Sequence, residues 1–522
     1  MRAASILLAA ALLAGVPAWG KQPPVPPVAA TSAVLSADHL LPLMQEWRGG
    51  TGTLSLAATS TLALDPAAPA DWTGEADLLA KDLAKVTGRT WQVVRRAARE
   101  GEVALRPTSA PLAAEGYRLS VDMKVTVEAS AAAGLYYGGR TLLQWLLTAP
   151  DPAKALLPRG VGNDHPRYGR RVVMLDLGRR YFQMDSIKAL IARMGFYKLN
   201  TLHLHFTDWP AFRLDSPRYP GLAPAGASYS REDVKQIEAW AAQHHITIVP
   251  EIDIPAHAVA LTDYKPELGF KCPSMRSSHW LREAAPTIGD KAWTVDITRP
   301  ENAEWLKGLL GEFIPWFSGP YFHVGGDEYQ YDADKERCPE LMEATKRMGL
   351  KYPGDVFIDW INQSNQVVKA HGKRTMIWSW WGFKDDKTST LPDRDIIVEV
   401  WNQEMEAQIK KDGFDIILTP EDTMYVTPWE DINRNSNYGL FDLEKVYERY
   451  PHDTSPQVLG YALAIWADRA ERHTDHYFLS RAEEPMLVMA ERLWTGPARG
   501  SVWDLMRRAD RIDTARRGLA ER

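Results

Sequence analysis

The 522-residue sequence has few cysteines, no excess of basic residues and, after residue 20, no apolar run of membrane-spanning length. Its 61 Lys and Arg against 67 Asp and Glu give a net charge of −6, which argues against nucleic acid or an anionic membrane as a partner. With 45% hydrophobic and 25% charged residues, a disordered chain, a coiled coil and a collagen-like fibre are excluded. The two cysteines, Cys272 and Cys338, leave both a disulfide and two buried free thiols open.

The first 20 residues have the organisation of a signal peptide. Arg2 gives a positive end, an apolar run follows from residue 3 to residue 16, and Ala18-Trp19-Gly20 offers a small-x-small cleavage site. The run is short for a transmembrane helix, and a retained anchor is the alternative. We expect residues 1–20 to be removed and the protein to be exported, to the periplasm or outside the cell, without membrane attachment afterwards.

Residues 21–165 are predicted to form a small α+β domain. After a lead-in rich in Pro and Ala, residues 75–86 have the apolar spacing of an amphipathic helix that ends at Gly88. Residues 117–128 alternate apolar and polar positions, as half-buried strands do, and residues 131–147 form a second helix. These elements indicate a small sheet covered by helices.

Residues 166–522 alternate apolar runs with helical segments. Eight runs are predicted as strands, at residues 172–177, 201–206, 246–252, 321–325, 375–378, 396–401, 414–418 and 460–466. Helices are predicted at 185–194, 231–243, 301–313 and 355–370. This alternation favours an α/β fold, a (β/α)8 TIM barrel with a C-terminal helix, over an open doubly wound sheet. No glycine-rich nucleotide loop follows any strand.

Polar or aromatic residues stand at the end of every predicted strand. Parallel barrels carry their active sites at the carboxyl ends of the strands. The residues at these ends, in strand order, are Asp176, His203 and His205 with Asp208, Glu251 with Asp253 and His257, Asp327 with Glu328, Trp378, Trp401 with Asn402, Tyr425, and Trp466 with Asp468. One buried carboxylate beside a histidine is often structural, but a whole ring of such ends indicates a functional site.

The fourth strand carries the sharpest signal, the segment His323-Val324-Gly325-Gly326-Asp327-Glu328. Because side chains alternate along a strand, His323, Gly325 and Asp327 are expected on one face. The glycines remove side-chain bulk, which lets a ligand approach the backbone. Two adjacent carboxylates in different environments can be held in different protonation states, as acid–base chemistry requires.

Several of these segments resemble one known family. Residues 323–328 resemble the signature of glycoside hydrolase family 20, the β-N-acetylhexosaminidases. Residues 171–182 (RVVMLDLGRRYF), 197–208 (YKLNTLHLHFTD) and 250–257 (PEIDIPAH) resemble the first three strands of that family. Residues 115–147 resemble the non-catalytic domain that precedes its barrel, so the resemblance covers residues 35–500 approximately.

The resemblance implies a hydrolase that removes terminal β-linked N-acetylhexosamine, GlcNAc or GalNAc, from an oligosaccharide. It further implies retaining, substrate-assisted catalysis through an oxazolinium intermediate. Glu328 would be the general acid/base, Asp327 would orient the acetamido N–H, and Tyr425 would donate to the acetamido oxygen. The other implied roles are a supporting His257–Asp208 pair and sugar binding by Arg171, Trp378, Trp401, Trp466 and Asp468. The partner is then a glycan, and no metal or organic cofactor is implied.

The sequence departs from the commoner family pattern at a few positions. Trp466-Ala467-Asp468 stands where the family often has Trp-x-Glu, so the carboxylate is one methylene shorter toward the 4- and 6-hydroxyls of the sugar. Family members with Trp-x-Asp include lacto-N-biosidases, which release a disaccharide. These departures leave open whether a monosaccharide or a disaccharide is released, and whether GlcNAc or GalNAc is preferred.

Two other classes of function fit parts of the sequence. His203-x-His205 resembles the metal-binding pair of barrel amidohydrolases. Further ligands would come from His257, Asp253 and Glu328, but no later strand ends in another histidine, so we expect His203 and His205 to brace strand ends. A non-catalytic glycan-binding protein would explain why 15 of the 20 tryptophans follow residue 170, but not the adjacent Asp-Glu pair of the fourth strand.

Overall fold

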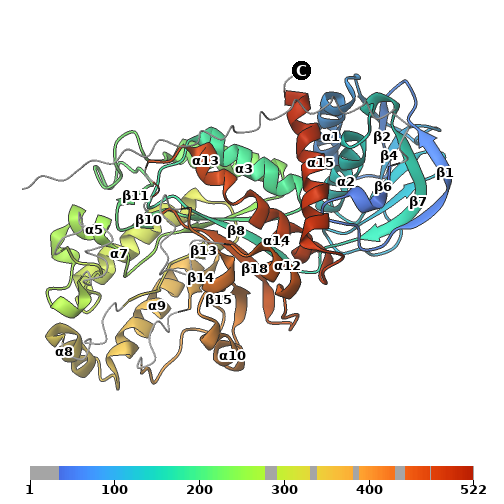
Figure 1. Cartoon of the computed structure of the whole chain (residues 1–522). Coiled ribbons are helices and arrows are strands. Elements are labelled where there is room, and N and C mark those ends of the chain that lie inside the picture. Colours follow the sequence, from blue (N-terminus) through green and yellow to red (C-terminus); the bar gives the residue numbers. More distant parts are fainter. Residues whose placement is uncertain are drawn as a thin grey trace, which may run out of the picture.

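The computed structural model describes residues 35–276, 291–329, 338–379, 387–428, 441–468, 470 and 472–520. A small domain and a barrel lie side by side, with both in contact with the last helix (Figure 1). The predicted signal peptide lies outside the described residues, and so do Trp380 and Trp381, which follow Trp378 in the sequence. Among the described residues, no helix is both long and apolar enough to cross a membrane.

The small domain is a seven-stranded sheet with two long helices. Its strands, in the spatial order β1-β7-β5-β6-β4-β2-β3, are β1 (Arg48–Ser55), β7 (Leu156–Asp164), β5 (Tyr117–Val121), β6 (Val125–Ala129), β4 (Val103–Pro107), β2 (Thr61–Leu64) and β3 (Gln92–Arg95). The helices are α1 (Trp72–Thr87) and α2 (Ala132–Leu147). The alternating stretch at 117–128 is an antiparallel hairpin, with Leu119 opposite Val127 in the core. Helix α2 is buried from Gly134 to Leu147.

The second region is a closed barrel of eight parallel strands, so the predicted TIM barrel is confirmed. Its strands are β8 (Arg170–Asp176), β9 (Thr201–His205), β12 (Thr247–Glu251), β13 (Tyr321–His323), β14 (Arg374–Trp378), β15 (Ile397–Val400), β16 (Asp415–Leu418) and β18 (Val458–Ile465). Neighbours in this order pair in parallel, and β18 closes the barrel by pairing with both β16 and β8. Apolar side chains fill the interior below the strand ends, where Val172, Val249 and Ile417 pack together.

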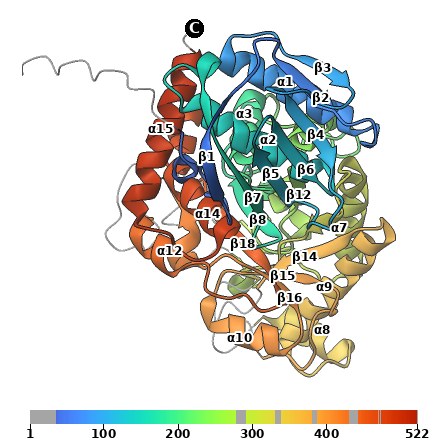
Figure 2. The same cartoon turned by 90° about the vertical axis from the view of Figure 1, so that its right-hand side faces the viewer.

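Helices surround the barrel and join it to the small domain. The outer helices are α3 (Met184–Phe196), α4 (Arg231–Gln243), α7 (Pro300–Phe313), α8 (Pro339–Arg347), α9 (Pro353–Ala370), α10 (Gln403–Lys411), α12 (Leu443–Arg449) and α14 (Glu483–Thr495). Shorter elements near the strand ends are β10 (Thr207–Asp208), β11 (Ala211–Phe212), α5 (Val259–Tyr264), α11 (Glu421–Met424), β17 (Tyr425–Val426) and α13 (Asp475–Ser480). The last helix, α15 (Val502–Ala520), runs along both domains (Figures 1 and 2).

One disulfide joins Cys272 to Cys338, with 5.4 Å between the Cα atoms. It connects the chain after α5 to the start of α8, on either side of strand β13. Of the two alternatives that the sequence leaves open, the structure therefore has the disulfide.

Candidate active site

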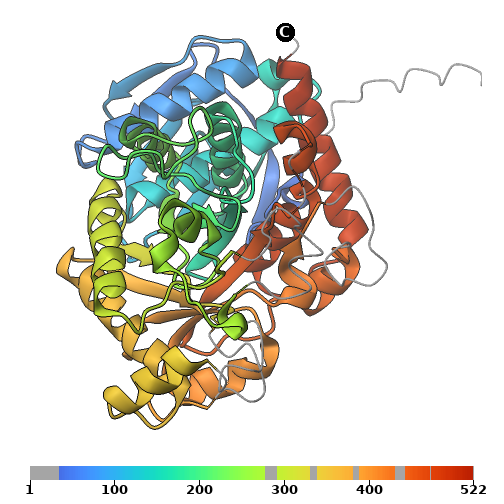
Figure 3. The same cartoon turned by 90° about the vertical axis from the view of Figure 1, so that its left-hand side faces the viewer.

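The carboxyl ends of the barrel strands face away from the small domain. Arg171, at the start of β8, forms an ion pair of 2.8 Å with Glu115 of the small domain, so the amino ends meet that domain. On the opposite side lie the loops that carry β10, β11 and α5 (Figures 1 and 3). The strand-end residues singled out in the sequence gather on this opposite side.

The glycines after β13 turn the chain sharply before the two carboxylates. Gly325 and Gly326 have φ values of 70° and 99°, in the left-handed region that glycine adopts without strain. A Cβ on Gly325 would lie 1.8 Å from Oδ1 of Asp253, so no other residue fits there. The predicted strand thus ends at His323, two residues early, and Asp327 and Glu328 are presented by a turn instead of by strand alternation.

His257 connects Asp208 to Glu328. The Nδ1 atom of His257 lies 3.2 Å from a carboxylate oxygen of Asp208, and its Nε2 lies 3.1 Å from Oε2 of Glu328. Burial alone would lower the pKa of His257, but Asp208 and then Asp327 raise this pKa well above its ordinary value. A positively charged imidazole is therefore favoured between the two carboxylates, which brings together three residues that lie far apart in the sequence.

Asp327 adjoins this group but keeps one oxygen unpaired. Its side chain is 13% exposed and Oδ2 lies 3.6 Å from Nε2 of His257, whereas the buried Oδ1 has no hydrogen-bond partner among the described residues. Burial, opposed by His257 and reinforced by Glu328, raises the pKa of Asp327 to about 6. The backbone N–H of Gly326 donates to Asp253, and burial together with the Asp327 charge raises the pKa of Asp253 well above its usual range.

The predicted sugar-binding role of Arg171 is contradicted by its position. Arg171 has no exposed surface and donates to Glu115 and to the carbonyl oxygens of Lys198 and Tyr168, at the amino end of the barrel. It is therefore on the far side of the barrel from Asp327, where it joins the two domains.

Arg179, which the pattern of strand ends did not single out, is the arginine that lies at the carboxyl end. Its guanidinium lies 3.0 Å from Asp176, 2.8 Å from Asp208 and 3.3 Å from Asp468, and stacks 5.1 Å over the ring of Trp466. Burial would raise the pKa of Asp208, but Arg179 and then His257 outweigh it and hold this pKa well below its usual range. The signal was available, because Arg179 follows the end of the first predicted strand by two residues.

Aromatic rings form a wall beside the carboxylates. The rings of Trp378 and Trp466 lie 5.9 Å apart, and Tyr425 lies 5.7 Å from Trp466. Trp401 packs on the same cluster and donates from Nε1 to the carbonyl oxygen of Ser379. Trp378 is only 1% exposed, so it forms the base of this wall, whereas Trp401 and Tyr425 are half-buried.

The histidines at 203 and 205 lie inside the barrel rather than at its mouth. His205 contacts Glu251 through Nδ1 at 2.5 Å and Asp208 through Nε2 at 3.0 Å, and His203 lies between Glu251 and Glu399. Burial works against a charge on either ring, but these carboxylates raise the pKa of His203 to about 9 and that of His205 well above its ordinary value. Both rings are thus fixed by carboxylates in the barrel interior, below the mouth.

Three groups of described residues bring at least three possible metal ligands within 4.8 Å of one another at the barrel's carboxyl end, and each includes a histidine. The groups are His203 with Glu251 and His323, His205 with Glu251 and Asp253, and Asp253 with His257 and Asp327. In the last two the histidine is favoured in its charged form, as described above. In the first, Nδ1 of His323 accepts a hydrogen bond from the backbone N–H of Gly325.

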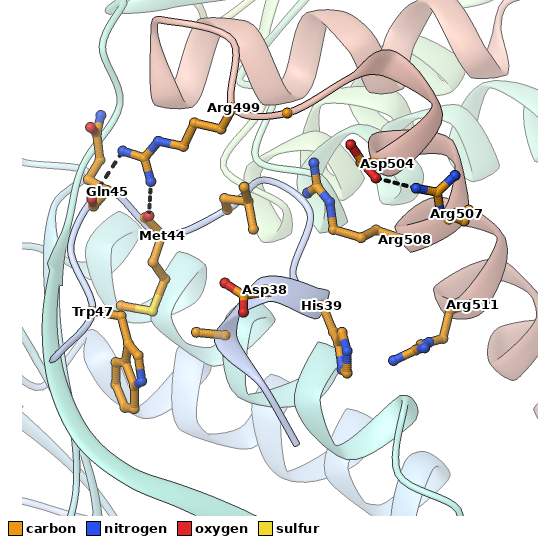
Figure 4. A pocket seen from close by; sticks show the side chains of 13 residues that line it. Asp38, His39, Met44, Gln45, Trp47, Arg499, Asp504, Arg507, Arg508 and Arg511 are labelled. Atoms are coloured by element: carbon orange, nitrogen blue, oxygen red, sulfur yellow. Dashed lines mark hydrogen bonds and ion pairs between the residues drawn. The ribbon is translucent and has the colours of Figure 1, made fainter. Parts of the chain in front are cut away.

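A cavity of about 690 Å³ lies away from these residues, between the segment 37–47 and α15 (Figure 4). Arg499 donates there to the carbonyl oxygens of Met44 and Gln45, and Arg507 pairs with Asp504. These contacts join the two ends of the described chain. The cavity has no pair of adjacent carboxylates, so the chemistry points to the barrel mouth instead.

Known proteins of one family resemble both regions of the chain. A model of glycosyl hydrolase family 20, catalytic domain, matches residues 168–497, and a model of domain 2 of the same family matches residues 38–163. A β-hexosaminidase of Porphyromonas gingivalis is 28% identical over 436 residues, which cover 77% of this chain and 54% of that protein. A β-hexosaminidase of Vibrio furnissii is 27% identical over 401 residues, which cover 70% of this chain and 63% of that protein. The chain thus spans little more than half the length of these relatives.

A solved structure shows the same fold. The β-N-acetylhexosaminidase from Bacteroides fragilis superposes with a TM-score of 0.75 at 24% identity, covering 92% of this chain and 96% of that chain. Since the catalytic-domain model matches more than half of the sequence and a second model matches the preceding domain, this chain belongs to glycosyl hydrolase family 20.

Proposed function

We propose that this protein is a β-N-acetylhexosaminidase that removes terminal β-linked N-acetylhexosamine from oligosaccharides. One observation carries the proposal: Asp327 and Glu328 are adjacent, Asp327 keeps a buried oxygen with no hydrogen-bond partner among the described residues, and Glu328 contacts His257. An unpaired carboxylate oxygen suits an acetamido N–H, and a carboxyl group 30% exposed suits proton exchange with a substrate oxygen.

In the first step the substrate supplies its own nucleophile. The acetamido oxygen bonds to the anomeric carbon while the glycosidic bond breaks, and Glu328 gives its proton to the leaving oxygen. Asp327 accepts the acetamido N–H, which aims the oxygen at the anomeric carbon. Its negative charge also stabilises the positive oxazolinium that forms.

In the second step water reverses the roles. Water bonds to the anomeric carbon as the oxazolinium C–O bond breaks, and Glu328 takes up the proton of the water. Both steps invert the anomeric carbon, so the configuration is retained overall. His257, held by Asp208, orients the Glu328 carboxyl group through both steps.

The remaining residues of the mouth would hold the sugar. Trp466 and Trp401 would pack on the apolar faces of the sugar ring, and Tyr425 would donate to the acetamido oxygen. Arg179 takes the hydroxyl-binding role that the sequence suggested for Arg171, because it lies beside Asp468 at the carboxyl end.

Two aryl glycosides test the proposal. The 4-nitrophenyl β-glycoside of GlcNAc should turn over rapidly, whereas the 4-nitrophenyl β-glucoside, which lacks the acetamido nucleophile, should react at least about 1,000-fold more slowly. NMR of the first sugar released should show the β-anomer. Similar rates on the two glycosides, or release of the α-anomer, would contradict the mechanism.

Release of a disaccharide is the second candidate. It is favoured by Asp468, whose shorter side chain is engaged by Arg179 at 3.3 Å. Incubation with defined oligosaccharides and mass analysis of the products separates the two candidates, because they differ in the mass of the first sugar released.

We also propose that the protein works outside the cytoplasm, in the periplasm or beyond. The signal-like residues 1–20 and the Cys272–Cys338 disulfide both support export, since disulfides persist in oxidising compartments. Fractionation of cells that express the full chain, with N-terminal sequencing of the product, tests this point.

A further inference from the structure

Glu251 ends strand β12 and is buried beneath the barrel mouth, and its two carboxylate oxygens serve different parts of the site. Oε2 contacts Nδ1 of His205 at 2.5 Å. Oε1 accepts a hydrogen bond of 2.6 Å from Nε1 of Trp378. One side chain therefore connects a histidine inside the barrel with a tryptophan of the aromatic wall.

The first oxygen begins a chain of contacts that reaches the acid/base. Beyond His205, the chain passes through Asp208 at 3.0 Å and His257 at 3.2 Å, and ends at Glu328 at 3.1 Å. Carboxylates and imidazoles alternate along it. Every contact except the last involves groups that are at most 6% exposed, so water has little access to it.

The charge of Glu251 determines which groups donate and which accept along this chain of contacts. Burial would lower the pKa of His205, but Glu251, followed by Asp208, raises it well above its ordinary value. A charged His205 donates from both nitrogens, so Asp208 must accept from it. Asp208 then also accepts from Nδ1 of His257, which leaves the Nε2–H of that ring directed at Glu328.

The second oxygen fixes the base of the aromatic wall. Trp378 has one donor, its Nε1–H, and Glu251 accepts it in the barrel interior. This bond sets the rotation of the indole ring, which also packs against Met174 and Trp466 and against the rings of His203 and His323.

Other groups around Glu251 keep it ionised. Nε2 of His203 lies 3.0 Å from Oε2, and Nδ1 of His323 lies 3.2 Å from Oε1. Burial would raise the pKa of Glu251, but His205, followed by His323 and His203, holds it well below its usual range. Burial lowers the pKa of His323, so His203 and His205 supply the positive charge. Farther out, Glu399 lies 3.3 Å from Nδ1 of His203, whereas the raised pKa of Asp253 favours the neutral form of that carboxyl group.

We propose that Glu251 is a positioning residue that couples the base of the sugar pocket to the acid/base group. It orients Glu328 through His205, Asp208 and His257, and it orients Trp378 directly. This inference rests on the proposed acid/base role of Glu328. It adds that both orientations depend on one carboxylate that touches neither the substrate nor Glu328.

Glu251→Gln tests the proposal. The amide has one accepting oxygen, whereas the Nδ1–H of His205 and the Nε1–H of Trp378 each require an acceptor. The readout is kcat/KM for aryl β-GlcNAc glycosides, which reports the first step alone. Their leaving groups range from 3,4-dinitrophenol, with a pKa of about 5, to phenol, with a pKa of about 10, and only the poor leaving groups need the acid. We expect kcat/KM to fall about 100-fold with phenol and about 10-fold with dinitrophenol.

Two variants separate the chain of contacts that leads to Glu328 from the hydrogen bond to Trp378. His205→Gln cuts the chain to Glu328 and should reproduce the dependence on the leaving group with little change in KM. Trp378→Phe removes the Nε1–H together with the five-membered ring of the indole, and should raise KM about 5-fold, with the dependence on the leaving group as in the wild type.

Glu399→Gln is the matched control. Glu399 is as buried as Glu251 and contacts His203, but its other bond leads to Thr419. Its variant should keep the wild-type dependence on the leaving group, even if it is less stable. The alkaline limb of the pH profile should move to lower pH in Glu251→Gln, because the pKa of His205 falls, and should not move in Glu399→Gln.

Two results overturn the inference: a loss in Glu251→Gln that is equal for all leaving groups, or the same leaving-group dependence in Glu399→Gln. Failure of the proposed function looks different. In that case the wild-type protein itself would not distinguish the GlcNAc glycoside from the glucoside.

Discussion

The two ends of the barrel both bury charged groups, but they pair them differently. At the amino end each cation has its own anion: Arg171 pairs with Glu115 at 2.8 Å and Lys198 with Asp164 at 3.0 Å. At the carboxyl end the anions outnumber the cations. Arg179 is shared by Asp176, Asp208 and Asp468. His257 also contacts Asp208, and in addition Asp327 and Glu328, so these two cations face five carboxylates.

Hydrogen bonding shows the same difference. The four charged side chains of the amino end leave no buried nitrogen or oxygen unpaired among the described residues, whereas Oδ1 of Asp327, Oδ2 of Asp253 and Nε1 of Trp466 have no such partner. Unpaired buried polar atoms destabilise a folded protein and are therefore rare. At the amino end, where every charge is paired, the ion pairs hold the two domains together. At the carboxyl end, the unpaired atoms leave positions that a ligand can fill.

The largest expected effect comes from removing the proposed acid. Glu328→Gln should lower turnover of a phenyl β-GlcNAc glycoside about 10,000-fold, because the leaving oxygen receives no proton. Its melting temperature should stay close to that of the wild type. Glu115→Gln is the counterpart at the amino end and should lower the melting temperature while turnover of folded protein is kept. Turnover of Glu328→Gln within 10-fold of the wild type, roughly, would refute the assignment.

Asp327→Asn should lower kcat/KM about 1,000-fold, because an amide orients the acetamido group poorly and adds no negative charge. The pKa of Asp327, about 6, gives a pH test. Below this pH the carboxyl is protonated and cannot accept the N–H as an anion, so wild-type kcat/KM should fall as the pH drops through 6. Rate profiles over the acid range should show this limb in the wild type and not in Asp327→Asn.

Lys198→Met removes a cation from the paired charges at the amino end. The buried Asp164 is then left without its ion pair, which should lower the free energy of unfolding by about 3 kcal/mol. Urea denaturation measures the loss, and kcat of the folded variant should equal that of the wild type. Adding Asp164→Asn should recover part of the stability, because it removes the unpaired charge. If no stability is recovered, the loss does not come from the broken ion pair.

The smallest effect is expected at the rim of the site. Asp468 is 30% exposed and is held by Arg179, so Asp468→Glu extends the carboxylate without removing its charge. We expect KM to change about 5-fold, in opposite directions for the aryl glycosides of GlcNAc and GalNAc, which differ at the 4-hydroxyl. An equal change for both sugars would place Asp468 away from that hydroxyl.

Most of the fold could be predicted, because apolar periodicity reports local structure directly. The eight apolar runs are the eight barrel strands, and the predicted helices at 231–243 and 355–370 are α4 and α9 within two residues. The main shift is at β13, which ends at His323 because Gly325 adopts a positive φ. A pattern of residue types does not show the backbone turn that glycine permits.

The site could be predicted in part. Asp327, Glu328, His257 and Asp208 were all named from strand ends, and the structure brings them together. The sequence pattern does not distinguish Arg171 from Arg179 as the arginine that binds the sugar. Arg171 is the second residue of β8 and Arg179 follows the end of this strand, so roughly 20 Å of chain separates them. Only the direction of the strand decides which of the two reaches the sugar.

The sequence by itself determined the alternation of strands and helices and the adjacency of Asp327 and Glu328. The tertiary structure alone decided which side chains meet. His257 reaches Glu328 across 71 positions of sequence and Glu251 reaches Trp378 across 127, because neighbouring and facing strands bring distant residues to one end of the barrel. It also decided the charges, since burial and near neighbours, not residue type, set the pKa of Asp327 and His257.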